Sequence, residues 1–600
     1  MEELKRIPER SEIPEADKWA IGDLYATDAD WEEELKTVEQ DRAFLAAFAG
    51  KLKDPQQLYT YLQGSEALNV KADRLGNYCM RKADEDTRNA VYQAMQGRFM
   101  SVFVELGAAT SFDTPEIMAI SEEEMEQFYR EYPDLERYRR YLTNLRRMKE
   151  HTLSAAEEKL LAAAGEMADA PDTIYGAFAD ADLTFPDAVD SKGETHPLTQ
   201  GTFVPLEENP DRVLRKSAYE NLYDGFAGFR NTAASILNAQ NKQLKFFAEA
   251  RNYATAFERS LDRTDVPTSV YHNLIEAVHK NLDKMHRYVR LRKKLLGLEQ
   301  LHFYDIYTPL VEDADRKIPY AEARQTVYDA LHPLGEDYRA ILQEGFENRW
   351  IDVYQNVGKR SGAYSAGAAV HPFVLLNYSG TLDSQFTLAH EMGHAIHSYL
   401  SNRHQNPIDA DYVIFVAEVA STCNEALLME HLLAKTTDKK ERAYLINHFL
   451  DQFRGTLYRQ TMFAEFELNI GKMAQEGKSL TPDVLNAEYR RLNKLYFGEN
   501  IVLDDEIDME WMRIPHFYYN YYVFQYATGY AAAIALSRRI LKEGESAVKD
   551  YIGFLSGGCS KSPIDLLKGA GVDMSTTAPV EQALELFNEL LGEMEALMAE

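Results

Sequence analysis

Residues 386–399 constrain the fold of this chain more than any other stretch of its sequence. The stretch is rich in apolar residues, contains no proline and carries His390 and His394, with Glu391 directly after the first histidine. Residues four apart lie above one another on one face of an α-helix, so both imidazoles can face the same ion. The spacing therefore predicts a helix that holds a metal ion, with Glu391 placed to accept a proton from water.

The alternative interpretation is a solvated helix that carries two histidines on its edge. Leu388, Met392 and Ile396 argue against it, because they belong to an apolar stripe that would bury the helix. Buried imidazoles need partners, which a metal ion would provide. Gly393 is a poor helix former, so its presence indicates that another segment packs closely against this helix.

A catalytic zinc ion has three protein ligands and one open position, so the chain must supply a third ligand. Leu400 stands where the metzincin pattern requires a histidine, which excludes that class. His397 and His404 follow on the same helix, where three histidines rarely converge on one ion.

Two carboxylates further along the chain are better candidates for the third ligand. Glu418 and Glu425 lie seven positions apart, on one face of an apolar helical segment at 415–426. Buried carboxylates of this kind need a cation or a bound proton. Asn424 and Glu425 superficially match the ligand motif of thermolysin-like enzymes, and the spacing alone leaves both glutamates open.

The segment before the metal-binding helix predicts a short strand. Phe373–Tyr378 has strand character and ends in a turn at Ser379–Gly380. We expect an edge strand, whose unpaired N–H and C=O groups can bind an extended peptide. Tyr378 and Gly380 are therefore candidates for substrate binding. The alternative is an ordinary core strand.

A tyrosine-rich stretch, residues 515–530, predicts a second functional element. An aromatic core helix is the simpler interpretation, but every buried phenol needs a hydrogen-bond partner, and so many are costly in a dry core. A polar cleft accommodates the hydroxyl groups better. The candidate residues are His516, Tyr519, Tyr522 and Tyr526.

The net charge and the apolar content of the sequence disfavour several classes of partner. The net charge is −31, which disfavours nucleic acid and anionic membranes. No run of 18 apolar residues is present, and no apolar segment follows Met1–Arg6, so we expect an unexported, cytoplasmic protein. The three cysteines are far apart and predict neither disulfides nor a cysteine metal site. The oligomeric state does not follow from the sequence.

The periodicity predicts a mainly α fold. Helical patterns extend from Asp30 onward, and later helices are expected over 232–250, 270–296 and 320–332. A β-hairpin is expected between Asp182–Phe185 and Thr195–Leu198, around a glycine-containing turn. The change of period there predicts an N-terminal helical domain over residues 1–200 and a catalytic domain over residues 201–600.

Several motifs together resemble the thimet oligopeptidase family of zinc metallopeptidases, and in particular its oligoendopeptidase F branch. The resemblance covers nearly the whole chain. Its motifs are residues 390–397 and 415–421, with further matches at 17–25, 360–365, 371–381, 514–519 and 566–573.

The resemblance implies a large helical enzyme with a deep internal channel that cleaves short oligopeptides and spares folded proteins. It implies one Zn²⁺ per chain, with Glu418 as the third ligand beside His390 and His394. Glu425 then becomes a residue that orients a histidine. His516 and Tyr519 are implied as donors to the tetrahedral intermediate.

Two rival functions make different demands on the sequence. A non-catalytic helical protein with a structural metal would fill all four metal positions with protein and would need no Glu391. A zinc carboxypeptidase or dipeptidyl carboxypeptidase would need a cation for the substrate carboxylate, and Arg360 or Arg513 could supply it.

Overall fold

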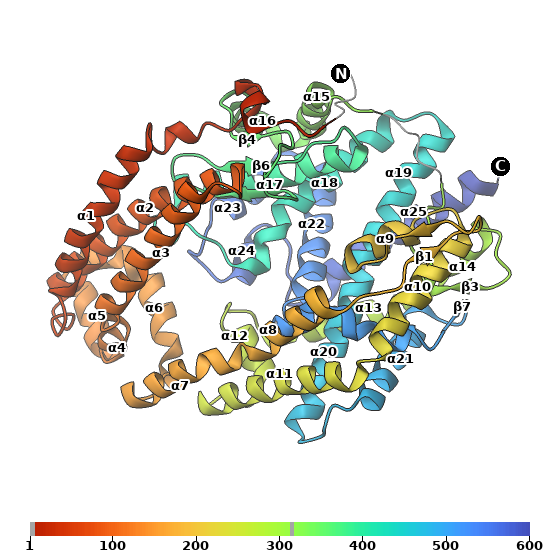
Figure 1. Ribbon diagram of the computed structural model, residues 1–600. Helices are drawn as coiled ribbons and strands as arrows, with labels where there is room; N and C mark the ends of the chain where they lie inside the picture. Colours follow the sequence, from red (N-terminus) through yellow and green to blue (C-terminus); the bar gives the residue numbers. More distant parts are fainter. Residues whose placement is uncertain (1–5, 312–316, 600) are drawn as a thin grey trace. The chain divides into compact units, whose positions relative to one another are not determined.

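The computed structural model describes residues 6–311 and 317–599 of the chain, most of which are helical (Figure 1). The chain packs as two compact units, each assembled from three separate stretches. The first unit comprises residues 1–149, 316–431 and 536–571, and the second comprises residues 150–315, 432–535 and 572–600. The predicted domain boundary near residue 200 stays a prediction. Within the described ranges, no helix is both long enough and apolar enough to cross a membrane.

The first unit is built mainly from helices, several of which begin at a side-chain cap. Ser121 and Glu124 form a capping box, as do Thr27 and Asp30. The indole of Trp31 is fully buried and donates to the carbonyl of Leu75, which joins two of the helices. The helices are α1 (Asp28–Ala46), α2 (Pro55–Glu85), α3 (Ala90–Thr110), α4 (Asp113–Met118), α5 (Glu122–Glu131), α6 (Arg139–Arg147), α15 (Tyr320–Ala330), α16 (Gly335–Glu347), α17 (Leu382–His404), most of α18 (Ile414–Lys435), α23 (Glu545–Leu555) and α24 (Pro563–Gly569).

The first unit also contains a small sheet that lies in the chain just before α17. Its strands are β4 (Ile351–Asp352), β5 (Tyr364–Ala366) and β6 (Phe373–Leu375), in the order β4-β6-β5. β6 pairs with β4 in parallel and with β5 in antiparallel fashion, and all three of its residues are buried. The prediction that this segment is an edge strand is therefore wrong, because β6 has a partner on each side.

The second unit holds the remaining helices and two small sheets. The helices are α7 (Ala155–Ala168), α8 (Ala170–Gly176), α9 (Gln200–Glu207), α10 (Arg212–Ala227), α11 (Arg230–Ala250), α12 (Ala256–Asp262), α13 (Thr268–His279), α14 (Leu282–Leu295), α19 (Lys439–Gln452), α20 (Arg459–Gln475), α21 (Pro482–Phe497), most of α22 (Phe524–Glu543) and α25 (Ala578–Ala599). The strands are β1 (Ala188–Val189), β2 (Thr195–His196), β3 (Leu301–His302) and β7 (Ile501–Val502).

The predicted β-hairpin is present, but its first strand lies later than expected. β1 pairs with β2 in antiparallel fashion, with Ala188 opposite His196. Gly193 in the connecting turn has φ +83°, a value that favours glycine. The expected first strand at 182–185 lies outside this pairing.

One predicted helix and the tyrosine-rich stretch are both interrupted. The expected helix over 270–296 is divided into α13 and α14, where the side chain of Asn281 donates to the carbonyl of Ala277. The tyrosine-rich stretch is not one helix: a 3₁₀ turn, η11 (Pro515–Tyr518), precedes an irregular segment, and α22 begins only at Phe524.

Candidate metal centre

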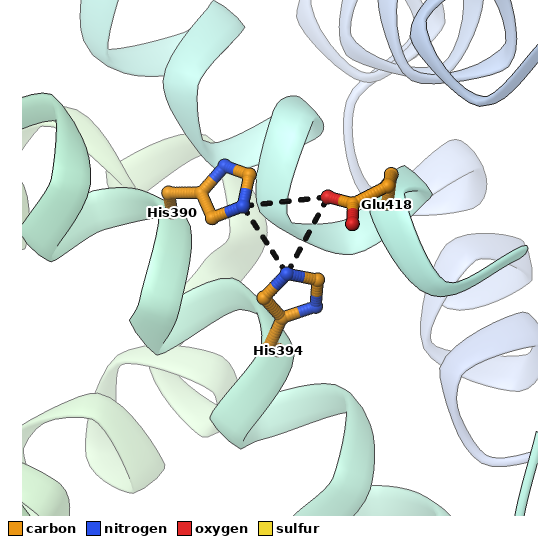
Figure 2. Close-up of side chains that lie close together, drawn as sticks. All are labelled: His390, His394 and Glu418. Carbon is orange, nitrogen blue, oxygen red and sulfur yellow. Dashed lines mark hydrogen bonds and ion pairs between the residues drawn. The ribbon is translucent and has the colours of Figure 1, made fainter. Parts of the chain in front are cut away.

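α17 carries both histidines of the predicted metal site. The helix starts after Gly380, which has φ +78°, and the Thr381 side chain caps it by accepting from the Ser384 amide. His390 and His394 lie one turn apart on the helix and turn a ring nitrogen toward a common point, as predicted from their spacing (Figure 2).

A carboxylate from α18 meets the two imidazoles. Oε2 of Glu418 lies 3.3 Å from Nε2 of His390 and 3.5 Å from Nε2 of His394. The two imidazole nitrogens are 3.2 Å apart. The three side chains therefore present one donor atom each to a common point (Figure 2).

These separations fit a single bound ion. Zinc is bound at about 2.0–2.2 Å by histidine nitrogen and carboxylate oxygen, and tetrahedral angles then place neighbouring ligand atoms about 3.3–3.5 Å apart. Two imidazoles and one carboxylate also form a donor set known from catalytic zinc sites, which leaves one position for water or substrate. His390, His394 and Glu418 thus make a candidate metal site.

Close packing of α17 against α18 brings the ligands together. A methyl group on Gly393 would lie 2.6 Å from Cα of Ser421 and 2.7 Å from the carbonyl oxygen of Ala420. Both atoms belong to the α18 backbone, which cannot move aside as a flexible side chain can. Only glycine permits this approach, in agreement with the expectation that a segment packs closely on Gly393.

Other side chains of α18 hold the donors in place. Glu425 contacts Nδ1 of His390, which leaves Nε2 of that ring facing the other donors. The Ser421 hydroxyl donates to Oε2 of Glu418 at 3.1 Å. Asn424 is fully buried, and it donates to the carbonyl of Ala389 and accepts from the hydroxyl of Tyr338. The sequence reasoning missed the roles of Ser421 and Asn424, although Ser421 lies three residues after Glu418 and hence on the same face.

Glu391 lies beside the donors in a buried position. Its side chain is nearly inaccessible, and its Oε2 has no hydrogen-bond partner among the described residues. Burial raises the pKa of its carboxyl group, against the opposing influence of His390 and His394. A partly desolvated carboxylate of this kind is a stronger proton acceptor than one in water.

The other two histidines of α17 have different surroundings. The ring of His397 is buried and stacks on Tyr412 with centroids 3.8 Å apart, and burial lowers its pKa to about 3. Nδ1 of His404 contacts the carbonyl oxygen of Leu400. Neither belongs to the donor group formed by His390, His394 and Glu418.

Tyr378 and Gly380 are both tied to Ile318. The Tyr378 hydroxyl donates to the Ile318 carbonyl at 2.8 Å, and the Gly380 carbonyl accepts from the Ile318 amide at 2.8 Å. The amide of Tyr378 donates to the carbonyl of Val353. These groups are engaged within the first unit, and a role in substrate binding stays a prediction.

The tyrosine-rich segment presents a cluster of polar rings within the second unit. The His516 ring lies 5.4 Å from Tyr519, 6.5 Å from Tyr522 and 5.9 Å from Tyr526, measured between centroids. Tyr519 is 48% exposed. Burial lowers the pKa of His516, and the charge of Arg459 lowers it further, so a neutral imidazole is favoured.

The two arginines that a carboxypeptidase could use are both paired. Arg360 lies 3.3 Å from Asp84. Arg513 has a largely buried side chain, lies 3.5 Å from Glu510 and stacks over the ring of Phe203. The Arg360 side chain is 61% exposed and that of Arg513 is 10% exposed, and each already has a carboxylate partner. Neither contact supports a role in capturing a substrate carboxylate.

Comparisons with known proteins agree on one protein family. Residues 205–586 match peptidase family M3, and residues 116–185 match oligopeptidase F. The chain is 44% identical to oligopeptidase PepF of Bacillus subtilis, over 99% of this chain and 89% of that protein. It is 40% identical to an oligoendopeptidase F homolog of Lactococcus lactis, over 98% of each. The crystal structure of oligoendopeptidase-F from Enterococcus faecium superposes with a TM-score of 0.73 at 38% identity, covering 95% of this chain and 98% of that one.

Proposed function

The chain belongs to peptidase family M3 and is a metallo-endopeptidase, and we propose that it cleaves internal bonds of short, unstructured oligopeptides with one zinc ion. The observation that carries the zinc proposal is the convergence of His390, His394 and Glu418 with donor separations of 3.2–3.5 Å. The relatives named as oligopeptidases support the substrate class.

In this proposal His390, His394 and Glu418 hold the ion, and one coordination position stays open. When bound, the ion would supply Lewis-acid chemistry, which polarises a carbonyl group and makes water a better nucleophile. Glu425 fixes the orientation of the His390 ring through Nδ1, as carboxylates commonly do beside metal-binding histidines.

Glu391 is the proposed general base. It accepts the proton of the attacking water and then gives it to the leaving amine. Its burial supports this role, as does its Oε2, which has no partner in the part of the chain that the structure describes, because a carboxylate already paired inside the protein would be a weaker acceptor.

His516 and Tyr519 are the proposed donors to the oxygen that becomes negatively charged as the tetrahedral species forms. The exposure of Tyr519 and the favoured neutral state of His516 support this role. Tyr522 and Tyr526, whose rings lie 5.2 Å apart beside them, are proposed to contact the peptide.

We also propose that the enzyme acts in the cytoplasm. Cys79 and Cys423 are free and buried, which suits a reducing compartment, where thiols stay reduced.

One experiment tests the reaction class. A short peptide blocked at both ends is incubated with the enzyme, with and without a chelator, and the products are identified by mass spectrometry. We expect internal cleavage that the chelator abolishes and that added Zn²⁺ restores. Cleavage that requires a free C-terminus would contradict the endopeptidase assignment and favour a carboxypeptidase.

A matched substrate tests the restriction to unstructured peptides. The same cleavable sequence is placed within a stably folded protein and offered under native conditions. We expect the peptide to be cleaved and the folded protein to stay intact. Rapid internal cleavage of the folded protein would contradict this part of the proposal.

A further inference from the structure

The segment that joins η11 to α22 has an unusual backbone. Asn520 and Tyr521 are adjacent, and they have φ values of 58° and 59°. This left-handed region is tolerated by asparagine but is an outlier for a bulky residue such as tyrosine. Such strain persists only where surrounding contacts impose it, and it often occurs at functional sites.

Glu467 on α20 provides one of these contacts. Its Oε1 accepts from the backbone amide of Tyr521 at 2.6 Å. Its side chain is buried, and Oε2 has no hydrogen-bond partner among the described residues. Burying a carboxyl group with one oxygen unpaired is costly. The hydrogen bond to the strained Tyr521 amide explains why a glutamate occupies this buried position.

Gly471, one turn further along α20, accommodates the ring of Tyr521. A methyl group at this position would lie 2.0 Å from the Tyr521 hydroxyl oxygen, so any larger residue would displace the ring. The ring also packs edge-on against Phe257 and Tyr271, at centroid distances of 5.3 Å and 6.3 Å. Both the side chain and the backbone amide of Tyr521 are therefore held against α20.

A second anchor comes from α11. The buried side chain of Gln240 donates to the carbonyl of Tyr518 and to Oδ1 of Asn520, both at 3.0 Å. Phe517 packs on α20 against Phe463 and Phe466, at 5.5 Å and 5.0 Å. The inward-facing residues of the segment are thus held from two helices, while His516, Tyr519 and Tyr522 are less buried.

We propose that Glu467 is a positioning residue: by holding the amide of Tyr521, whose ring lies over Gly471, it maintains the strained turn that orients His516 and Tyr519. This proposal rests on the proposed function, in which these two residues donate to the oxyanion. All the residues of this contact belong to the second unit. Burial raises the pKa of Glu467 to about 8, so near pH 7 it is mainly a neutral acid, which glutamine closely imitates.

The test compares Glu467→Met with Glu467→Gln. Methionine is similar in size but offers no acceptor of comparable strength to the Tyr521 amide, whereas glutamine keeps an acceptor oxygen. A displacement of about 1 Å can cost about 100-fold in rate. We therefore expect Glu467→Met to lower kcat by about 10- to 100-fold with KM changed much less, and Glu467→Gln to retain most of kcat. Metal content should stay at the wild-type level in both variants.

Gly471→Ala should disturb the same turn by displacing the ring of Tyr521, and it should give the same loss of kcat. If Glu467→Met does not fold, Gly471→Ala tests the positioning role in its place. Its matched control is Gly455→Ala, because a methyl group there meets no atom within 4 Å. Wild-type kcat in both Glu467→Met and Gly471→Ala, measured per folded molecule, would overturn the proposal.

A double-mutant cycle separates this proposal from the function on which it rests. If Glu467 acts through Tyr519, Glu467→Met should cost markedly less in a Tyr519→Phe background than in the wild type. An equal loss in both backgrounds would overturn the positioning role. Tyr519→Phe with wild-type kcat would contradict the proposed oxyanion role itself. Impaired Tyr519→Phe beside a fully active Glu467→Met would contradict the positioning role alone.

Discussion

Glu391 and Glu418 lie beside the same two imidazoles, yet their surroundings differ. Oε2 of Glu418 lies within 3.5 Å of both rings and also accepts from Ser421. Glu391 is more deeply buried and keeps one oxygen without a partner among the described residues. One carboxylate is thus arranged as a fixed ligand and the other as a proton acceptor.

Glu391→Gln should therefore keep the metal and abolish turnover. Glutamine preserves the shape of the side chain but cannot accept the proton of the attacking water. Metal content by elemental analysis and peptide cleavage should be measured on the same sample. An empty metal site in this variant would contradict the assignment of Glu391 as a base rather than a ligand.

Replacement of Glu418 and of Glu425 should affect metal binding to different degrees. Glu418→Ala removes a donor and should lose most of the metal. Glu425→Ala removes only the contact to Nδ1 of His390, and it should weaken metal affinity by about 10- to 100-fold. Competitive titration with a chromophoric chelator gives both affinities, and the reverse order would exclude Glu418 as the third ligand.

Tyr519→Phe should lower kcat with KM nearly unchanged. A donor aimed at the developing oxyanion stabilises the transition state more than the bound substrate, and losing one such donor costs about 100- to 1,000-fold in kcat. The melting temperature should stay near that of the wild type, because Tyr519 is 48% exposed and the substitution keeps its ring. A fall in stability with unchanged kcat per folded molecule would instead identify Tyr519 as a structural residue.

At the scale of elements, the metal site depends on the approach of α17 to α18. Gly393→Ala should destabilise the first unit and weaken metal binding, because the added methyl group would lie 2.6 Å from a backbone atom of Ser421. Overpacking of this kind typically costs about 1–3 kcal/mol.

Gly553 in α23 is the matched control for this variant, since a methyl group there meets no atom within 4 Å. Gly553→Ala should leave metal binding unchanged and stabilise the helix by about 0.5–1 kcal/mol. Thermal melting with and without metal measures both effects. Equal melting temperatures and metal affinities for Gly393→Ala and Gly553→Ala would show that the helices can separate without cost.

The predictability of each element follows from where its stabilising contacts lie. α17 could be predicted because its caps, apolar stripe and histidine spacing all lie within one helix. The choice between Glu418 and Glu425 could not be made from periodicity, because both project from one face of α18. Their different roles depend on which nitrogen of His390 each one approaches.

Two of the differences between the predicted and the observed elements depend on contacts far away in sequence. The sequence predicts that β6 is an edge strand, but β6 pairs with β4, and the two strands are separated by a long stretch of chain. The tyrosine-rich stretch, for which a core helix is the simpler interpretation of the sequence, is not one helix. Its turn at Asn520 and Tyr521 depends on Gln240 and Glu467, which local periodicity cannot connect to it.

At the scale of the whole molecule, each unit is assembled from three stretches, so the chain passes repeatedly from one unit to the other. The chain has 96 acidic residues, and most of those that the structure describes are not buried. Glu467 is one of the buried exceptions. A buried acid makes stability depend on pH in a way that surface carboxylates do not.

Glu467 should make the wild-type protein less stable as pH rises. Its pKa is about 8 in the folded state and about 4.3 in an unfolded chain, so its stabilising contribution is complete below about pH 4 and is lost as pH rises to about 8. The neighbouring phenols of Tyr271 and Tyr521 stay neutral in this window, because burial raises the pKa of each above its usual value.

Glu467→Gln has no titrating group at this position and isolates the effect. We expect the melting temperature of the variant, relative to the wild type, to rise between about pH 5 and pH 8 and to level off above pH 8. The free-energy difference over this window should be on the order of a few kcal/mol, since one pKa unit corresponds to about 1.4 kcal/mol. All other titrating groups are common to both proteins, so their contributions cancel in the difference. A difference in melting temperature that stays constant from pH 5 to pH 9 would show that Glu467 is ionised in the folded protein throughout.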